Sequence, residues 1–201
     1  MGYTLDEAFC NILSGLHGSA VYQRLRDQCG DDFDVTSFKS LSRQCWLSYL
    51  KIHGMPVKPG FFELLRVIEA LKYPFCLATN SRRDDAEFCL QAAGLADVFD
   101  VIVTRDDVVR GKPSPAIVHT AAARLGLSSD DCLVLEDSPV GVAAAVAAEA
   151  PCIFVPSQRP VDERVSSQAY RVFDDLEQVA EFVSSVDSMA SVRCSVLSAG
   201  G

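Results

Sequence analysis

The spacing of apolar residues divides this chain into a helical part and a part in which helices and strands alternate. Over residues 1–53 the apolar positions recur every three or four residues, which is typical of amphipathic helices, and no strand pattern is present. The segment Gly54–Gly60 then holds two prolines and two glycines, a composition that predicts a hinge or a domain boundary. We therefore expect a helical domain over residues 1–56 and a second domain over residues 57–183.

Short apolar runs alternate with helical patterns after this boundary. The runs cover 74–78, 101–103, 132–135 and 152–155, and helical spacing is found over 61–71, 83–93, 114–125, 140–148 and 176–183. Continuous apolar runs of this length between helices indicate parallel strands that are buried on both faces. The predicted fold class is α/β, with a doubly wound parallel sheet. Residues 184–201 are rich in serine and end in Gly-Gly, so we expect a mobile C-terminal tail.

Composition and charge exclude several classes of function. The 201 residues are 49% hydrophobic and 22% charged, and the formal net charge is −9. A net anion is a poor partner for nucleic acid or an anionic membrane, and no apolar run is long enough to predict a membrane span. The eight cysteines form no Cys-x-x-Cys pair, which argues against a zinc ribbon and favours a reducing, cytoplasmic location. We expect a small-molecule partner, and the sequence does not fix the oligomeric state.

Polar residues that suit phosphate and a metal ion follow three of the apolar runs. Ligands of an open parallel sheet bind beyond the carboxyl ends of its strands. Thr79-Asn80-Ser81 follows the first run, Lys112 follows the second, and Glu136-Asp137 follows the third. A hydroxyl, neighbouring N–H groups and an ammonium can bind phosphate oxygens, and Mg²⁺ takes one or two carboxylates. The sequence therefore predicts a site for phosphoryl groups at one edge of the sheet.

Each of these residues also has a structural explanation. Thr79-Asn80-Ser81 could cap the helix that follows, since these residue types favour helix N-caps. Lys112 stands between glycine and proline and could be an exposed turn residue. Ser138-Pro139 is a good helix start. Glu136 is harder to explain in this way, because an acid at the end of a buried strand must be exposed or paired.

Taken together, the three groups resemble the motifs of the haloacid dehalogenase (HAD) superfamily. The spacing Thr79-Asn80-Ser81, then Gly111-Lys112-Pro113-x-Pro115, then Leu135-Glu136-Asp137-Ser138-x-x-Gly141 is most similar to subfamily IA, the capped phosphatases and β-phosphoglucomutase relatives. The resemblance implies that Thr79 and Lys112 are catalytic, that Asn80 and Ser81 also bind phosphate, and that Glu136 and Asp137 hold Mg²⁺. It further implies a HAD-like (Rossmannoid) core, with residues 1–56 as the helical cap.

The first motif of this family, Asp-x-Asp-Gly at the end of the first core strand, has no match in residues 1–201. In that motif the first Asp attacks phosphorus and the second is the general acid and base. Asp31-Asp32-Phe33-Asp34 lacks a preceding apolar strand, and Asp84-Asp85 begins a helix, so neither replaces it. The resemblance places the first core strand between the strands that end at Thr79 and Leu135. We expect this strand to be missing, the facing edges to be unpaired, and the chain to be inactive as written.

Three functions fit these motifs. The first is a Mg²⁺-dependent phosphatase that acts on small phosphorylated metabolites such as sugar phosphates. The second is a sugar phosphomutase of the β-phosphoglucomutase type, which is disfavoured because Gly18 stands where the mutases carry a phosphate-binding Arg. The third is a non-catalytic fragment that binds phosphate or a partner through the remaining half of the site.

Overall fold

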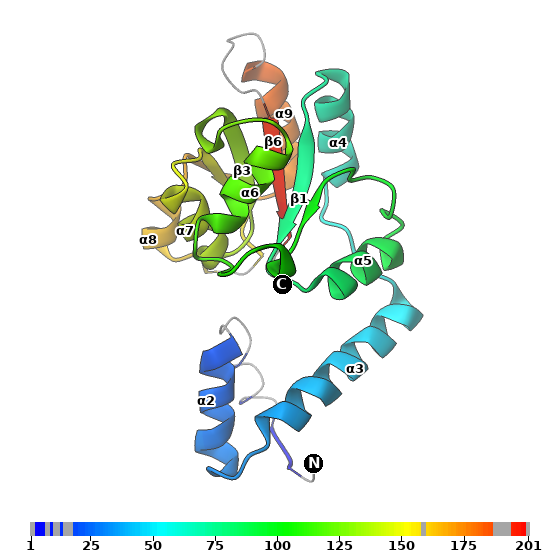
Figure 1. Cartoon of the computed structure of the whole chain (residues 1–201), viewed down its shortest axis with the longest axis vertical. Helices are drawn as coiled ribbons and strands as arrows, with labels where there is room; N and C mark the ends of the chain where they lie inside the picture. Colours follow the sequence, from blue (N-terminus) through cyan, green and yellow to red (C-terminus); the bar gives the residue numbers. More distant parts are fainter. Residues whose placement is uncertain are drawn as a thin grey trace. The chain divides into compact units, whose positions relative to one another are not determined.

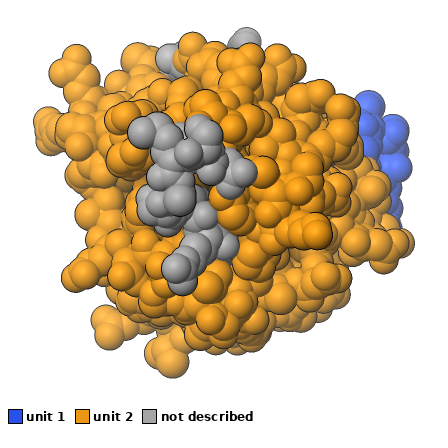
Figure 2. Space-filling model, turned by 90° about the horizontal axis from the view of Figure 1, so that it is seen from above, with its two compact units in different colours: residues 1–54 blue, residues 55–201 orange. Residues whose placement is uncertain are grey.

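The computed structural model describes residues 3–6, 9, 13, 18–157, 160–186 and 194–199. The chain forms two compact units, Met1–Gly54 and Met55–Gly201, which Figure 2 shows in different colours. The boundary between the units falls at Gly54, the first residue of the segment that is rich in glycine and proline. No helix in these described stretches is both long enough and apolar enough to cross a membrane.

Two helices make up most of the first unit. They are α2, which spans Gly18–Cys29, and α3, which spans Val35–His53. Asp34 caps α3, because its Oδ1 accepts hydrogen bonds from the backbone N–H groups of Thr36 and Ser37, both at 3.0 Å. The described part of residues 1–53 therefore has the helical character that the apolar spacing predicts.

The second unit is built on one six-stranded parallel sheet (Figure 1). Its strands are β1 Phe75–Thr79, β2 Ile102–Val103, β3 Cys132–Glu136, β4 Cys152–Phe154, β5 Arg171–Val172 and β6 Cys194–Ala199. They lie in the order β2-β1-β6-β3-β4-β5, and every neighbouring pair is parallel. A strand overlaps each predicted apolar run, and the predicted α/β class is confirmed.

Helices cover both faces of this sheet. They are α4 Phe61–Ala70, α5 Arg83–Ala92, α6 Ala116–Arg124, α7 Pro139–Ala147, α8 Glu163–Ser166 and α9 Leu176–Val186, with 3₁₀ turns η1 at Arg105–Asp107 and η2 at Ser129–Asp131. Successive strand residues face opposite ways. Accordingly, Cys76 and Ala78 of β1 belong to the apolar core that includes α6 and α7, whereas Leu77 belongs to the core that includes α4 and α9. The fold is therefore doubly wound, as the sequence predicts.

The strand at the centre of the sheet comes from the segment that we expected to be a mobile tail. β6 lies between β1 and β3 and is parallel to both, with Leu197 opposite Leu77 on one side and Leu135 on the other. α9 continues to Val186, and the remaining residues of the expected tail, 187–193 and 200–201, lie outside the described residues. β6 therefore fills the position between β1 and β3 that we expected to be open.

Backbone hydrogen bonding explains this difference from the expectation. A buried N–H or C=O group without a partner costs roughly 1–3 kcal/mol, and two facing strand edges would leave several such groups. β6 pairs with five residues of β1 and with four residues of β3. The two open edges thus favour a strand in a segment whose own composition predicts none.

Candidate functional site

Lys112 lies at the centre of the candidate site, at the carboxyl edge of the sheet. Its side chain is 3% exposed, and its Nζ donates hydrogen bonds to Glu136 Oε1 at 2.7 Å and to the Ala78 carbonyl oxygen at 3.1 Å. Ala78 belongs to β1 and Glu136 to β3, which lie on either side of β6. The ammonium therefore joins the ends of two strands that are not neighbours. The explanation of Lys112 as an exposed turn residue is wrong.

Asn80 holds the loop that carries Lys112. Its Oδ1 accepts a hydrogen bond from the Lys112 backbone N–H at 2.8 Å, and its Nδ2 donates to the Lys112 carbonyl oxygen at 3.2 Å. Gly111 is required beside this contact, because a Cβ atom there would overlap Asn80 Oδ1 and the Arg105 side chain. The absence of a side chain at Gly111 thus lets the loop approach β1 closely enough for the ammonium to reach the strand ends.

Glu136, the last residue of β3, is almost fully buried. Its Oε1 pairs with Lys112, and its Oε2 accepts a hydrogen bond from the Ser138 hydroxyl at 3.3 Å. A Cβ atom on Gly141 would overlap the Glu136 carboxylate, so this glycine leaves room for the acid against the first turn of α7. Ser138 also caps α7, since its Oγ accepts from the Gly141 N–H at 3.2 Å, and the prediction of a helix start there is confirmed.

Asp137 has one carboxylate oxygen without a hydrogen-bond partner. Its Oδ2 accepts a hydrogen bond from the Ser157 hydroxyl at 2.6 Å, whereas Oδ1 is buried and bonds none of the described residues. The charge of Lys58 interacts with the charge of Asp137, and Lys58 Nζ donates a hydrogen bond to the Val155 carbonyl oxygen at 2.7 Å. Burial lowers the pKa of Lys58, and the negative charge of Asp137 opposes that shift. Because a buried acceptor without a partner costs free energy, Asp137 Oδ1 is suited to a cation.

Thr79 ends β1 and keeps a hydroxyl proton that can be donated. It is 2% exposed, and its Oγ1 accepts a hydrogen bond from the Ser81 backbone N–H at 3.1 Å. A hydroxyl that accepts one bond still has its own O–H to donate. The N-cap residue of α5 is Arg82, and α5 has no side-chain capping bond, so the explanation of Thr79-Asn80-Ser81 as a helix cap is wrong.

The two adjacent acids fit a magnesium ion. Among the described residues there is no cluster of three or more His, Cys, Asp or Glu side chains that could hold a metal. Mg²⁺ does not require one, because it binds one or two carboxylates together with water and phosphate oxygens. Asp137 Oδ1 has no hydrogen-bond partner among the described residues, whereas both oxygens of Glu136 already accept hydrogen bonds. Asp137 is therefore the better placed of the two predicted ligands.

Lys58 and Ser157 were not among the predicted site residues. Ser157 follows the fourth apolar run, beyond the carboxyl end of β4, so the rule that selected the other residues also applies to it. Lys58 stands between Pro56 and Pro59, in a segment whose composition predicts a hinge and gives no sign of a polar contact. Only the fold shows that this segment reaches the end of β4.

The fold and the site define a class of α/β proteins that present a buried lysine, a threonine and a pair of acids at the carboxyl edge of a parallel sheet. A family model described as haloacid dehalogenase-like hydrolase matches residues 16–149. The chain therefore belongs to the haloacid dehalogenase-like hydrolases, and the predicted resemblance is confirmed.

Two similar curated proteins are named as phosphatases. The chain is 32% identical over 135 residues to validoxylamine A 7'-phosphate phosphatase from Streptomyces hygroscopicus subsp. limoneus, and this aligned region covers 66% of this chain and 62% of that protein. It is 41% identical over 116 residues to a probable pseudouridine-5'-phosphatase from Drosophila melanogaster, and this aligned region covers 54% of this chain and 49% of that protein. The chain thus spans about half to three fifths of the length of these two relatives.

A solved structure extends the similarity over most of the chain. The HAD family hydrolase from Deinococcus radiodurans R1, with bound phosphate and sodium, has a TM-score of 0.73 and 27% sequence identity to this chain. The match covers 92% of this chain and 83% of that one. The similarity is therefore one of fold as well as of motifs.

Proposed function

We propose that this chain is a Mg²⁺-dependent HAD phosphatase domain for small phosphorylated metabolites such as sugar phosphates. One observation carries the proposal: the Lys112 ammonium contacts the ends of β1 and β3, where the Thr79 hydroxyl and the unpartnered oxygen of Asp137 also lie. The two similar proteins named as validoxylamine A 7'-phosphate phosphatase and probable pseudouridine-5'-phosphatase support a small phosphorylated substrate.

The environment of each residue supports a distinct role. Thr79 donates a hydrogen bond to a phosphoryl oxygen, Lys112 supplies a fixed positive charge, and Asp137 holds Mg²⁺ with Glu136 beside it. When bound, the ion would neutralise charge on the phosphoryl group. Phosphoryl transfer depends mainly on positioning and on such neutralisation. Because Glu136 already fixes the Lys112 ammonium at 2.7 Å, this charge needs little reorganisation when substrate binds.

We also propose that residues 1–201 bind phosphate and Mg²⁺ without turning substrate over. The HAD resemblance calls for a nucleophilic aspartate at the end of the strand between β1 and β3. In this chain that position belongs to β6, and neither Cys194–Ala199 nor the two glycines that follow contain a carboxylate. This composition favours the non-catalytic, phosphate-binding alternative for the chain by itself.

Binding and turnover can be measured separately. Isothermal titration with inorganic phosphate at a fixed Mg²⁺ concentration should show binding to the native chain. Thr79→Val removes the hydroxyl while keeping the shape of the side chain, and we expect it to weaken binding about tenfold, the loss of one charge-assisted hydrogen bond. Thr36→Val, at an exposed threonine of α3, is the matched control and should leave the affinity unchanged.

The two parts of the proposal have different refuting outcomes. A native chain that binds no phosphate would refute the phosphate site. A chain of residues 1–201 that releases phosphate from sugar phosphates above the buffer background, with Thr79→Val slower than Thr36→Val, would refute the absence of turnover and leave the site in place.

A further inference from the structure

A positively lined pocket lies beside the candidate site, on the loop that carries Lys112. It has a volume of about 680 Å³ and is lined by Asn80, Arg105, Arg110 and the segment Gly111–Ser114. No acidic residue lines it, although the chain as a whole carries a net charge of −9. Pockets of this size are typical of small-molecule sites. The pocket shares Lys112 and Asn80 with the candidate site but includes neither Thr79 nor Asp137.

Arg105 is held in place by the loop itself. Its Nη1 donates to the Val108 carbonyl oxygen at 2.7 Å, and its Nη2 donates to the Val109 carbonyl oxygen at 3.2 Å. These carbonyls are neutral acceptors, so they fix the guanidinium without cancelling its charge. The side chain also packs where Gly111 leaves room for it. Arg105 therefore brings a positioned positive charge to the pocket.

The acids of the same loop contact residues outside the pocket. Asp107 forms ion pairs with Arg83 at 2.8 Å and with Arg124 at 2.6 Å. Asp106 accepts a hydrogen bond from the Arg83 backbone N–H at 3.0 Å. Neither acid lines the pocket. The carboxylates nearest to Arg105 in the sequence are thus engaged with α5 and α6, and neither forms an ion pair with Arg105 or Arg110.

Arg110 is the residue of this pocket that is available to a ligand. It is exposed, and it makes no hydrogen bond or ion pair with any described residue. Two guanidinium groups that line one pocket repel each other, and an anion bound between them removes that repulsion. Guanidinium groups bind carboxylate and phosphate through paired hydrogen bonds.

We propose that this pocket binds a second anionic group of the ligand, a carboxylate or a second phosphate, when the first phosphate of that ligand lies beside Thr79 and Lys112. The inference rests on the proposed function, because it takes that phosphate site as given. It narrows the substrate class to metabolites with two anionic groups. Arg110 is the specificity-determining residue, and Arg105 and Asn80 hold the loop around it.

The test compares ligands that differ only in the second group. Methylphosphonate carries the first anionic group alone, phosphonoacetate adds a carboxylate, and ethane-1,2-diphosphonate adds a second phosphonate. Affinities are measured by isothermal titration at a fixed free Mg²⁺ concentration. In the native chain we expect phosphonoacetate or the diphosphonate to bind at least tenfold more tightly than methylphosphonate. The tighter of the two identifies the second group.

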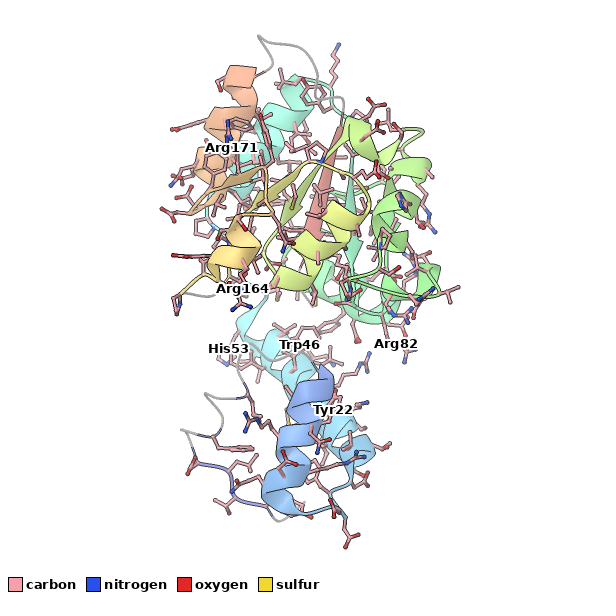
Figure 3. The ribbon with its side chains drawn as sticks, turned by 90° about the vertical axis from the view of Figure 1, so that its left-hand side faces the viewer. Tyr22, Trp46, His53, Arg82, Arg164 and Arg171 are labelled. Carbon is pink, nitrogen blue, oxygen red and sulfur yellow. The ribbon has the colours of Figure 1, made fainter. Side chains whose placement is uncertain are left out.

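Arg110→Gln should remove most of this gain and leave methylphosphonate affinity unchanged. The control is Arg164→Gln, which makes the same change at an exposed arginine of α8. Figure 3 shows Arg164 on the opposite side of the second unit from Arg82, the residue before α5. This control should retain the full gain. Both arginines are exposed, so both variants should keep the native melting temperature.

The outcomes separate this inference from the function on which it rests. Methylphosphonate binding with no gain from the second group, or a gain that Arg110→Gln retains, overturns the anion pocket alone. A native chain that binds none of the three ligands overturns the phosphate site and the pocket together. A gain lost in both arginine variants means that overall charge produces it, which also overturns the pocket.

Discussion

The ammonium nitrogen of Lys112 lies 2.7 Å from Oε1 of Glu136, and the two side chains are 3% and 1% exposed. This buried ion pair joins the loop that carries Lys112 to the last residue of β3. Burial makes each charge dependent on the other, because neither can be solvated if its partner is removed. Removal of either partner alone should therefore destabilise the fold as well as the candidate site.

Lys112→Met should lower the free energy of unfolding by about 3–5 kcal/mol, because it leaves the buried Glu136 carboxylate without a counter-charge. Adding Glu136→Gln should recover part of this loss, since the remaining charge is then removed as well. Urea denaturation followed by circular dichroism measures both effects. Arg66→Met is the control. Arg66 pairs with Glu63, and the two side chains are 70% and 56% exposed, so the free energy of unfolding should change by at most about 1 kcal/mol. Equal effects of Lys112→Met and Arg66→Met would contradict this account of the pair.

Asp137→Asn should abolish stabilisation by Mg²⁺. The native chain should melt at a higher temperature as MgCl₂ is added, by an amount equivalent to about 2.7 kcal/mol at one hundred times the dissociation constant. The variant loses the charge of the buried Oδ1 and should show no such rise. Differential scanning calorimetry with and without EDTA measures the shift. Asp97→Asn, at an exposed position after α5, should behave like the native chain. A similar Mg²⁺ response in both variants would place the ion elsewhere.

Leu197→Pro should lower the free energy of unfolding far more than a proline substitution in an edge strand. Leu197 stands in β6, which pairs on both sides, and proline removes a backbone donor from the ladder. We expect Leu197→Pro to cost about 3 kcal/mol or more. Val172→Pro in β5, which pairs on one side, should cost less. Chemical denaturation of the two variants gives the comparison, and a smaller loss for Leu197→Pro would argue against β6 as the central strand.

Asp34 should make the start of α3 sensitive to acid. Hydrogen bonds from the Ser37 hydroxyl and backbone N–H lower the pKa of this carboxyl below its ordinary value. A lowered folded pKa means that the capping contribution is complete above the ordinary pKa and is lost as the pH falls through the folded pKa. The Ser37 amide, followed by NMR as the pH is lowered below about 4, should report this loss. Asp34→Asn keeps a good cap without a titrating group, so its Ser37 signal should not change. An unchanged native signal would contradict the cap.

The buried cysteines should be chemically inert. Burial raises the pKa of Cys76 and of Cys152 to about 12, so almost no thiolate is present at neutral pH. Cys45 on α3 is exposed. Alkylation with iodoacetamide at pH 8, followed by peptide mass spectrometry, should therefore modify Cys45 and spare Cys76 and Cys152 until the chain is denatured. Equal labelling of all three in the native chain would show that the sheet is not packed as described.

Local patterns were sufficient to predict four of the strands and the chemistry at their ends. Short apolar runs between helices predict a parallel sheet whatever lies between its strands, and the same rule finds Thr79, Lys112 and Glu136. β6 could not be predicted in this way. Its sequence, Cys-Ser-Val-Leu-Ser-Ala, mixes apolar and small polar residues in a serine-rich region. These residues become a strand because β1 and β3, which are far away in the sequence, offer open edges.

Contacts between distant loops account for the rest of what the sequence did not show. The sequence near Asn80 does not indicate that its side-chain amide forms hydrogen bonds with the Lys112 backbone. The sequence near Gly141 does not indicate that this glycine leaves space for the Glu136 carboxylate. Each of these roles depends on which segments the sheet brings together. Residue types predicted the chemistry of the site, whereas the supporting contacts required the fold.

The position of β6 also sets an order of assembly during synthesis. As the chain leaves the ribosome, β1 and β2 can pair early, and β3, β4 and β5 can pair later, but the two half-sheets cannot be joined until residues 194–199 have emerged. Until then each half-sheet exposes a strand edge whose unpaired N–H and C=O groups can pair with other chains. A chain in which β6 has not yet docked therefore carries two unpaired strand edges, at β1 and at β3, which favour association with other chains.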